Sequence, residues 1–475
     1  MNTIYADDPL YSSTYQELTR IAGLATPAGG SLRIVGRDPV IGSRFRIGGA
    51  TAVALAAHAA AVAALWETRS GRSQQIEVDV RRSTVPGLRT SSHIHQNGQP
   101  LEVVSRTKFA MPGLGRTKDG RAFWFVSHPM HREQFLASLD VLQCRAMPDE
   151  IGAAVSRWDA EDLEEAMHAR KLTGVFARTR EEWRAHPQGK LLASRPSIEI
   201  DKIGESSARQ LGPGARPMTG VRVLDMTHVL AGPITSRTLA EHGGDVLRIS
   251  SPWRPEDAAI VLDTGHGKRS AHLDMDTYAG AAQARVLADQ ADILVSSFRT
   301  GALDRHGLSP AEVAKRNPGI IYVSISAYGS DGPWRLRAGY DPVGQLASGL
   351  AVEEGTLEWP RLAPTLTLND YLAAYLAAAG AVTALVRRGR EGGSYHVKVS
   401  LTHSSMWIQR VGLLTPEARL SDDAFIYPEP SDFIDVVSPF GILRVPAPIA
   451  QLSDTKAAWD KPPQPFGACA AVWQS

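Results

Sequence analysis

The sequence predicts an α/β fold, in which a doubly wound parallel sheet forms a nucleotide-binding domain and a smaller α+β domain accompanies it. From residue 221 onward, short runs rich in β-branched residues alternate with segments of helical periodicity. That alternation is typical of a parallel sheet with crossover helices. Residues 220–250 also have the pattern of strand, Gly-Pro turn, helix and second strand, but they lack the Gly-x-Gly-x-x-Gly loop of nicotinamide-binding domains. A nicotinamide oxidoreductase is therefore disfavoured.

The first half of the chain predicts fewer regular elements. Residues 50–66 form a long apolar run in which alanine predominates. The run is shorter than the roughly 20 residues needed to span a bilayer, so we interpret it as a buried helix. An Asp-Gly turn within residues 117–141 predicts a strand followed by a helix. Residues 177–205 predict a further helix and an extended segment.

The second half predicts five strands and three helices in alternation. The strands are expected at residues 221–226, 245–250, 271–275, 292–298 and 320–326, and the helices at 234–243, 278–290 and 311–317. Ligands of such sheets bind outside the carboxyl ends of the strands. The functional residues are therefore expected in the loops at 227–233, 263–270, 297–307 and 326–334.

An internal repeat links the two halves. Residues 60–83 and 380–404 share one order of features: an alanine-rich helix, an Ala-Leu pair, a basic turn containing glycine, a short alternating strand and the start of another helix. Agreement over several elements favours common origin over chance. We predict three segments: a degenerate repeat at 1–99, a small domain at 100–212, and a Rossmann-like nucleotide-binding domain with the C-terminal segment at 213–475. The Gly- and Pro-rich residues 209–220 are the expected linker.

The composition restricts the class of partner. Lys and Arg number 51 against 50 Asp and Glu, a formal charge of +1, which gives no field to attract nucleic acid or a membrane. The expected partner is a small molecule. Cys144 and Cys469 are the two cysteines of the chain, which predicts neither a disulfide framework nor a metal site and fits a cytoplasmic protein. The N-terminal residues show no secretory signal pattern.

Several ordered blocks resemble the family III CoA-transferases, which include formyl-CoA and carnitine CoA-transferases and the 2-methylacyl-CoA racemases. The blocks are residues 220–250, 267–275, 291–309, 317–334 and 338–350, and the resemblance covers roughly residues 216–404. It implies a rearranged chain, because a copy of the helix-turn-strand unit and the small domain precede the nucleotide-binding part. Residues 438–473 resemble the usual family ending.

The resemblance implies that Asp370 is a catalytic nucleophile. Family members use one aspartate at the start of the helix that precedes the basic turn, and a carboxylate with an ordinary pKa is ionised at pH 7 and attacks a thioester without a base. The alternative is structural, since Asn369 and Asp370 precede an alanine-rich helix and both residue types are favoured helix caps. Alignment of the repeats by their Ala-Leu pairs places Ala50 opposite Asp370, so one active site is expected.

The resemblance also implies a set of residues that bind CoA. An aromatic ring suits adenine stacking and arginine suits phosphate binding. Some of these residues also have a structural alternative. His228 could be an ordinary loop histidine and Arg305 a solvated arginine. Leu273 and Tyr328 could be core residues. Lys268 and Arg269 form a possible phosphate patch or an ordinary surface pair. The implied CoA-binding residues are His228, Ala231, Leu273, Phe298, Ala302, Arg305 and Tyr328.

Departures from the family pattern narrow the function. Leu230 replaces the glutamine of formyl-CoA transferases, which disfavours specificity for formyl-CoA or oxalyl-CoA. Ser250 and Ser251 replace an acidic-arginine pair that contacts CoA in the family, and Arg254 could supply that contact. Tyr340 stands where racemases carry histidine, and a phenol exchanges protons poorly at neutral pH. The family's glycine-rich loop has a weak counterpart at residues 111–115.

The resemblance implies an acyl-CoA:carboxylate CoA-transferase that acts through a covalent aspartyl intermediate. Two alternatives remain open: a 2-methylacyl-CoA racemase or isomerase, and a non-catalytic protein that binds CoA. Coenzyme A would enter as the substrate thioester with a carboxylic acid as acceptor. We expect no metal, and we expect the protein to form a homodimer.

Overall fold

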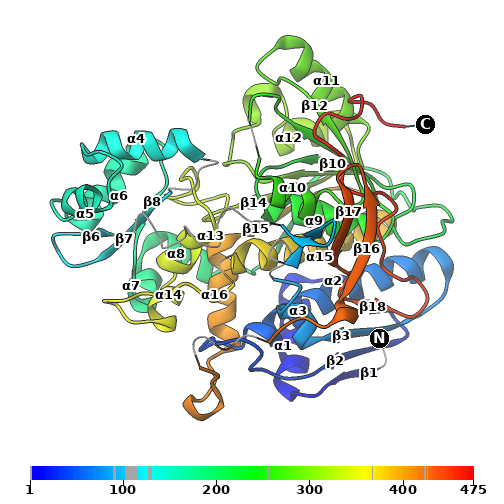
Figure 1. Cartoon of the computed structure of the whole chain (residues 1–475). Coiled ribbons are helices and arrows are strands. Elements are labelled where there is room, and N and C mark those ends of the chain that lie inside the picture. Colours follow the sequence, from blue (N-terminus) through cyan, green and yellow to red (C-terminus); the bar gives the residue numbers. More distant parts are fainter. Residues whose placement is uncertain are drawn as a thin grey trace.

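A seven-stranded sheet forms the centre of the protein, which we describe from a computed structural model covering residues 3–88, 93–101, 115–126, 131–254, 256–365, 367–421, 424 and 426–474 (Figure 1). The strand order is β12-β11-β10-β13-β14-β15-β9, with β9 antiparallel and the others parallel. The strands are β9 (Glu199–Gly204), β10 (Arg222–Met226), β11 (Asp245–Ser250), β12 (Lys268–His272), β13 (Ile293–Ser296), β14 (Ile321–Ser326) and β15 (Ser394–Ser400). The predicted fold class is confirmed.

Helices cover both faces of this sheet because its strands are apolar on both sides. Val223 and Val246 belong to the core cluster that includes residues of α9 and α15, whereas Leu224 and Leu247 pack with residues of α11 and α12 on the other face. The helices are α9 (Ala231–Ala240), α11 (Tyr278–Asp289), α12 (Pro310–Arg316) and α15 (Leu368–Glu391).

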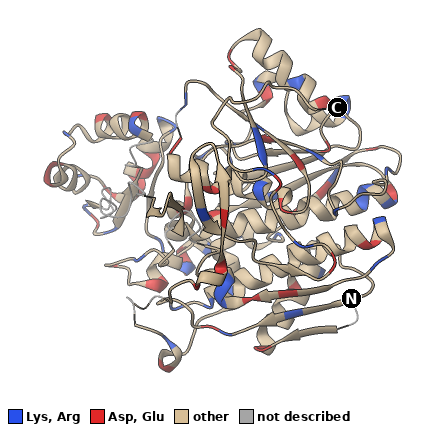
Figure 2. Ribbon diagram, turned by 45° about the vertical axis from the view of Figure 1, so that its right-hand side comes forward, with Lys and Arg blue, Asp and Glu red and all other residues tan. Residues whose placement is uncertain are grey.

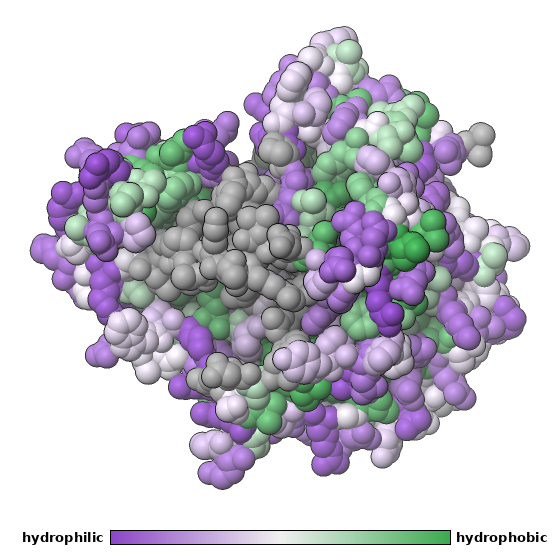
Figure 3. Space-filling view, viewed as in Figure 1, coloured by the Kyte–Doolittle hydropathy of each residue, from purple (hydrophilic) through white to green (hydrophobic). Residues whose placement is uncertain are grey.

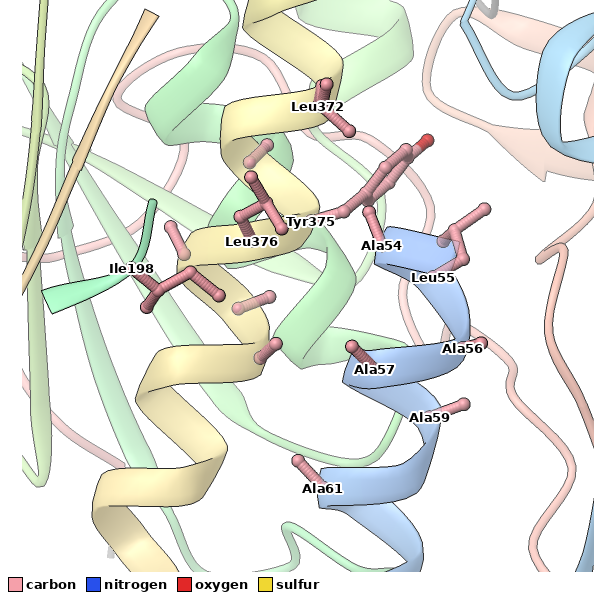
Figure 4. Close-up of a cluster of buried hydrophobic side chains, with 14 of the residues drawn as sticks. Ala54, Leu55, Ala56, Ala57, Ala59, Ala61, Ile198, Leu372, Tyr375 and Leu376 are labelled. Carbon is pink, nitrogen blue, oxygen red and sulfur yellow. The ribbon is translucent and has the colours of Figure 1, made fainter. Parts of the chain in front are cut away.

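The N-terminal residues form a second, smaller sheet of order β1-β2-β3-β18. Its parts are β1 (Thr3–Ala6), α1 (Pro9–Ala22), β2 (Ser31–Val35), α2 (Ile47–Ser70), β3 (Gln75–Asp79), α3 (Val80–Thr84) and β18 (Gln451–Leu452). The apolar stretches of α2 and α15 are both buried inside the protein, which confirms that the predicted helix lies in the core. Figure 4 shows why the two helices pack closely: Ala57 and Ala61 of α2 face α15 with methyl groups alone.

A separate α+β region lies beside the large sheet, at the left of Figure 1. Its three-stranded sheet and helices enclose a core that includes Phe123, Leu163 and Met167. The elements are β6 (Gly115–Arg116), β7 (Ala122–Phe125), α4 (Arg132–Leu142), α5 (Pro148–Val155), α6 (Ala160–Ala169), β8 (Gly174–Phe176), α7 (Arg180–Ala185) and α8 (Pro187–Ala193). It is joined to the body through α13 (Asp341–Ala347), α14 (Leu350–Glu354) and α16 (Leu401–Val411).

The C-terminal segment completes sheets that begin in the N-terminal part. β18 pairs with β3, and β17 pairs with β4. The remaining elements are β4 (His95–Gln96), β5 (Gln99–Pro100), α10 (Ala258–Thr264), β16 (Phe433–Ser438), β17 (Gly441–Pro446) and 3₁₀ turns at Asp304–His306, Pro416–Ala418 and Pro430–Asp432. The three predicted segments stay a prediction, and β9, which precedes the boundary at residue 212, is an edge strand of the large sheet.

Charged and apolar side chains are mixed over the protein. Figure 2 shows basic and acidic residues interspersed along the ribbon, and the face in Figure 3 has small hydrophobic areas among hydrophilic ones. This distribution agrees with the nearly balanced charge of the sequence.

We expect limited proteolysis within residues 212–217 to leave the two halves associated. Arg69 of α2 donates hydrogen bonds to the carbonyl oxygens of Gly212, Pro217 and Thr219, and the α2–α15 contact is buried. Separating the halves would expose a large apolar surface to water. Size-exclusion chromatography of the nicked protein should give one peak containing both fragments. Two fragments that elute separately as soluble species would contradict this packing.

Candidate active site

A pocket opens at the carboxyl ends of β10, β11, β12 and β13. Met226 and Ser250 line it where β10 and β11 end, and loop residues following each of the four strands complete it. This is the position that the predicted parallel sheet indicates for a ligand. Five of the residues implied to bind CoA line the pocket together: His228, Leu273, Phe298, Ala302 and Arg305.

Two other predicted residues lie outside this pocket lining. Ala231 is the first residue of α9 and is buried behind the loop that carries His228. Tyr328 belongs to an apolar cluster, where its ring meets Trp334 edge to face at 4.9 Å between centroids. Burial raises the pKa of Tyr328, so its phenol stays neutral. The structure thus places Tyr328 in the core.

The loop that carries His228 is held by its neighbours. The backbone N–H of His228 donates to Ser297 Oγ at 3.1 Å, which ties the turn after β10 to the turn after β13. Val229 has a positive φ of 68°, a conformation that β-branched residues rarely adopt. His228 Nε2 lies 4.0 Å from Glu256 Oε1 at the pocket wall. These contacts fix one end of the pocket.

Two ion pairs join strands of the large sheet. Lys268 Nζ lies 2.8 Å from Asp225 Oδ2, and both side chains are buried. Burial lowers the pKa of Lys268 to about 8. Arg269 is also buried and pairs with Asp245 at 3.0 Å. The interpretation of Lys268 and Arg269 as a phosphate patch is therefore wrong, because both belong to β12 and hold the sheet together.

Arginines and serines form another part of the rim. Arg254, Ser250 and Ser251 line the pocket, so a basic group is present near the position where the family's acidic-arginine pair is missing. Arg305 is exposed and lies 2.9 Å from Asp276. The rim therefore offers two guanidinium groups for an anionic ligand.

Asp370 is the third residue of α15, and 7% of it is exposed. The N-cap position belongs to Thr367, whose side chain makes no cap hydrogen bond. The carboxylate of Asp341 takes that role and accepts hydrogen bonds from the backbone N–H groups of Asn369 and Asp370, the latter at 3.3 Å. The interpretation of Asn369 and Asp370 as N-caps is therefore wrong, and the Asp370 carboxylate is not used for capping.

The two carboxylates affect each other's protonation. Burial, followed by the charge of Asp341, raises the pKa of Asp370 well above its usual range. Burial also raises the pKa of Asp341 to about 7. The pKa of Asp370 therefore differs from the ordinary carboxyl value expected from the sequence. A buried carboxylate with a raised pKa is a stronger base and nucleophile when it is ionised.

Three rings follow one another from the pocket, those of His228, His131 and Tyr340. The rings of His131 and His228 lie 6.3 Å apart, and those of His131 and Tyr340 lie 4.4 Å apart. Tyr340 immediately precedes Asp341, and its hydroxyl accepts a hydrogen bond of 2.9 Å from Gln134 Nε2. The rings therefore link the pocket residue His228 to Tyr340, the residue before Asp341 in the chain.

Sequence reasoning missed His131, Gln134 and the capping role of Asp341. Both His131 and Gln134 come from the α+β region, about 200 residues from Tyr340 along the chain, and no local pattern marks that contact. The predicted pairing of Ala50 with Asp370 is off by one residue: Asp370 is the third residue of α15, whereas the third residue of α2 is Gly49 and Ala50 is the fourth. The candidate glycine-rich loop at 111–115 falls almost entirely outside the described residues.

Comparison with known proteins gives a consistent set of relatives. Residues 218–423 match the family model described as CoA-transferase family III. The acetyl-coenzyme A transferase nodX of Hypoxylon pulicicidum is 30% identical over 331 residues, which are 65% of this chain and 56% of that relative. The succinyl-CoA–L-malate CoA-transferase alpha subunit of Chloroflexus aurantiacus is 31% identical over 243 residues, 48% of this chain and 51% of the relative.

Among solved structures, the crystal structure of Rv3272 from Mycobacterium tuberculosis shares 32% identity. The match covers 41% of this chain and 56% of that chain, with a TM-score of 0.39. The chain spans about half the length of the relatives it matches.

Proposed function

This chain belongs to CoA-transferase family III, and on that premise we propose that it is an acyl-CoA:carboxylate CoA-transferase that works through Asp370. One observation carries the proposal: five of the predicted CoA-binding residues meet in one pocket, and the buried carboxylate of Asp370, the predicted nucleophile, is not used for capping. Its position in the first turn of α15 also suits an anion, because the helix dipole is positive there.

The proposed reaction begins with acyl transfer to Asp370. An ionised Oδ of Asp370 attacks the thioester carbonyl carbon, the C–S bond breaks, and the electron pair leaves with CoA as the thiolate. The product is a mixed anhydride. The thiolate then attacks the side-chain carbonyl carbon of Asp370, which forms an aspartyl-CoA thioester and releases the first acid as its carboxylate.

The acceptor acid completes the cycle by the same steps in reverse. Its carboxylate attacks the aspartyl thioester, which forms a second anhydride and releases the CoA thiolate. Attack of the thiolate on the acceptor's acyl carbon then gives the new acyl-CoA and regenerates the Asp370 carboxylate. Once Asp370 is ionised, the cycle neither takes up nor releases a proton.

The pocket suits the adenosine and phosphate parts of CoA. Phe298 offers an aromatic face for stacking, while Arg254 and Arg305 offer hydrogen-bond donors to phosphate oxygens. The His228 ring lies 6.3 Å from that of His131, which lies 4.4 Å from that of Tyr340, the residue before Asp341. We therefore propose that the nucleotide occupies the outer pocket and that the thioester lies beyond His228, near Asp370.

Racemisation or isomerisation is the weaker proposal for this site. It needs a second group that exchanges a proton with the carbon next to the thioester. Burial raises the pKa of Tyr340, so its phenol holds its proton even more firmly at neutral pH. Incubating the protein with a panel of acyl-CoAs and free acids, with mass spectrometry of the products, tests the proposal. Transferase activity yields a new acyl-CoA, whereas isomerisation leaves the molecular mass unchanged.

Arg305→Ala is expected to weaken CoA binding by roughly 1 kcal/mol, about fivefold, because an exposed charge is screened by water and already paired with Asp276. Arg316→Ala is the matched control. Arg316 is another arginine of the same domain paired with an aspartate, Asp289 at 2.8 Å, but it lies outside the pocket lining. Calorimetric titration with CoA measures both variants. Equal dissociation constants for the two variants would show that Arg305 is an ordinary surface charge.

A further inference from the structure

The first copy of the internal repeat contains a counterpart of Asp341. Asp38 accepts hydrogen bonds from the backbone N–H groups of Gly48 at 2.9 Å and Gly49 at 2.7 Å, the second and third residues of α2. Asp341 receives the corresponding bonds from the second and third residues of α15. Both aspartates begin an Asp-Pro-Val sequence. Each long core helix is therefore capped by the same device.

The correspondence extends beyond these two caps. Asp79, at the end of β3, caps α3 by accepting from Arg82 N at 2.7 Å. Ser400, at the end of β15, caps α16 by accepting from His403 N at 3.3 Å. Since the duplicated unit repeats its caps with its helices, the Asp-Pro cap is a feature of the fold in both copies. A difference between the copies then marks what is special to the active site.

The copies differ in what faces the capping aspartate. In the first copy the third helix residue is Gly49, and a Cβ there would come within 2.0 Å of the Tyr11 ring. The hydroxyl of Tyr11 donates to Asp38 Oδ2 at 2.9 Å. In the second copy the third residue is Asp370, so a carboxylate faces Asp341 where a hydroxyl donor faces Asp38.

We propose that Asp341 is a positioning residue for Asp370: it fixes the first turn of α15 and sets a second negative charge against the Asp370 carboxylate. The proposal rests on the proposed function. Attack on the thioester turns the Asp370 carboxylate into a neutral anhydride and moves its charge to the CoA thiolate. The repulsion from Asp341 is therefore present before attack and is relieved by it, which favours acylation.

Other titratable groups on the elements packed against α15 have separate partners or are neutral. Tyr371, which follows Asp370, donates to Asp263 of α10, and Arg237 of α9 pairs with that same aspartate. Burial lowers the pKa of His403 in α16 to about 3 and that of His58 in α2 to about 4. Asp341 of α13 is thus the charge that acts on Asp370 among the described residues.

The pair Asp341→Asn and Asp38→Asn separates positioning from folding. Both oxygens of Asp38 and both of Asp341 accept hydrogen bonds, and asparagine keeps one acceptor oxygen, so both variants are expected to lower the melting temperature by a few degrees. In Asp341→Asn alone, loss of the neighbouring charge should shift the acid limb of the pH–rate profile to lower pH by about one unit or more. The KM for acyl-CoA should stay within a few-fold of the wild-type value. Identical acid limbs in both variants and the wild type would overturn the proposal.

A second measurement does not depend on turnover. Carboxyl resonances of ¹³C-labelled aspartate, assigned to Asp370 through Asp370→Asn, can be titrated in the wild type, in Asp38→Asn and in Asp341→Ser, whose hydroxyl still caps. We expect the Asp370 titration to move to lower pH only when Asp341 is replaced. An unmoved titration overturns the proposal even if the transferase assays succeed. A moved titration together with full activity of Asp370→Asn supports the coupling while contradicting the proposed function.

Discussion

Asp370→Asn is expected to lower acyl-CoA:carboxylate CoA-transferase turnover by at least several hundred-fold, roughly the scale for removal of a key catalytic group. An amide cannot attack the thioester as a carboxylate does. The fold should be retained, because the backbone N–H groups at the start of α15 are capped by Asp341 and not by Asp370. Steady-state kinetics and a melting curve, measured on the same preparation, give both quantities.

Asp79→Asn is the matched control for this variant. Asp79 also stands at the start of a helix in the repeated unit, and asparagine caps a helix about as well as aspartate. We expect near wild-type turnover and stability from Asp79→Asn. Normal turnover by Asp370→Asn would leave the CoA-binding, non-catalytic function as the better account of the site.

Asp225→Leu is expected to destabilise the protein by about 3–5 kcal/mol, because it leaves the Lys268 ammonium buried without its counter-charge. The same substitution removes the acceptor of the Ser236 hydroxyl in α9. Since Asp225 lies in β10 just before the His228 loop, CoA binding should weaken as well. Denaturant unfolding measures the free energy of unfolding of the variant.

The double variant Asp225→Leu/Lys268→Met tests the cause of that loss. Replacing both partners of a buried ion pair with apolar residues of similar volume is often neutral, whereas removing one partner is costly. We expect the double variant to recover at least half of the lost stability. A double variant as unstable as Asp225→Leu would instead assign the loss to packing or to the Ser236 hydrogen bond.

The sequence predicts the parts of the fold that follow local periodicity. The parallel strands from residue 221 onward alternate with helices, and the buried helix within Ile47–Ser70 is visible as an alanine-rich run. The extended segment within residues 177–205 is predicted, but its antiparallel pairing with β15 as Glu199–Gly204 and the pairing of Gln451–Leu452 with β3 are not. Edge strands outside a βαβ unit carry no alternation with helices, so their partners are decided by tertiary packing.

Some residues of the site can likewise be predicted from the sequence, whereas others depend on tertiary contacts. His228 and Phe298 follow strand ends of one parallel sheet, so their meeting in one pocket follows from topology. His131 and the cap from Asp341 depend on contacts between distant segments. Lys268 shows the limit most clearly, because a basic residue in a short basic pair is ordinarily exposed, yet here it is neutralised inside the sheet by Asp225.

The covalent role of Asp370 is tested most directly by trapping the intermediate. The protein is incubated with an acyl-CoA that supports turnover, quenched with hydroxylamine and digested, and the peptide containing Asp370 is analysed by mass spectrometry. An anhydride or thioester at the side chain would react to give a hydroxamate. We expect a hydroxamate at Asp370 in the wild-type protein. It should be absent from the Asp370→Asn variant and from the wild-type peptide that contains Ala50. Active protein whose Asp370 peptide stays unmodified, or whose hydroxamate forms on another residue, would contradict it.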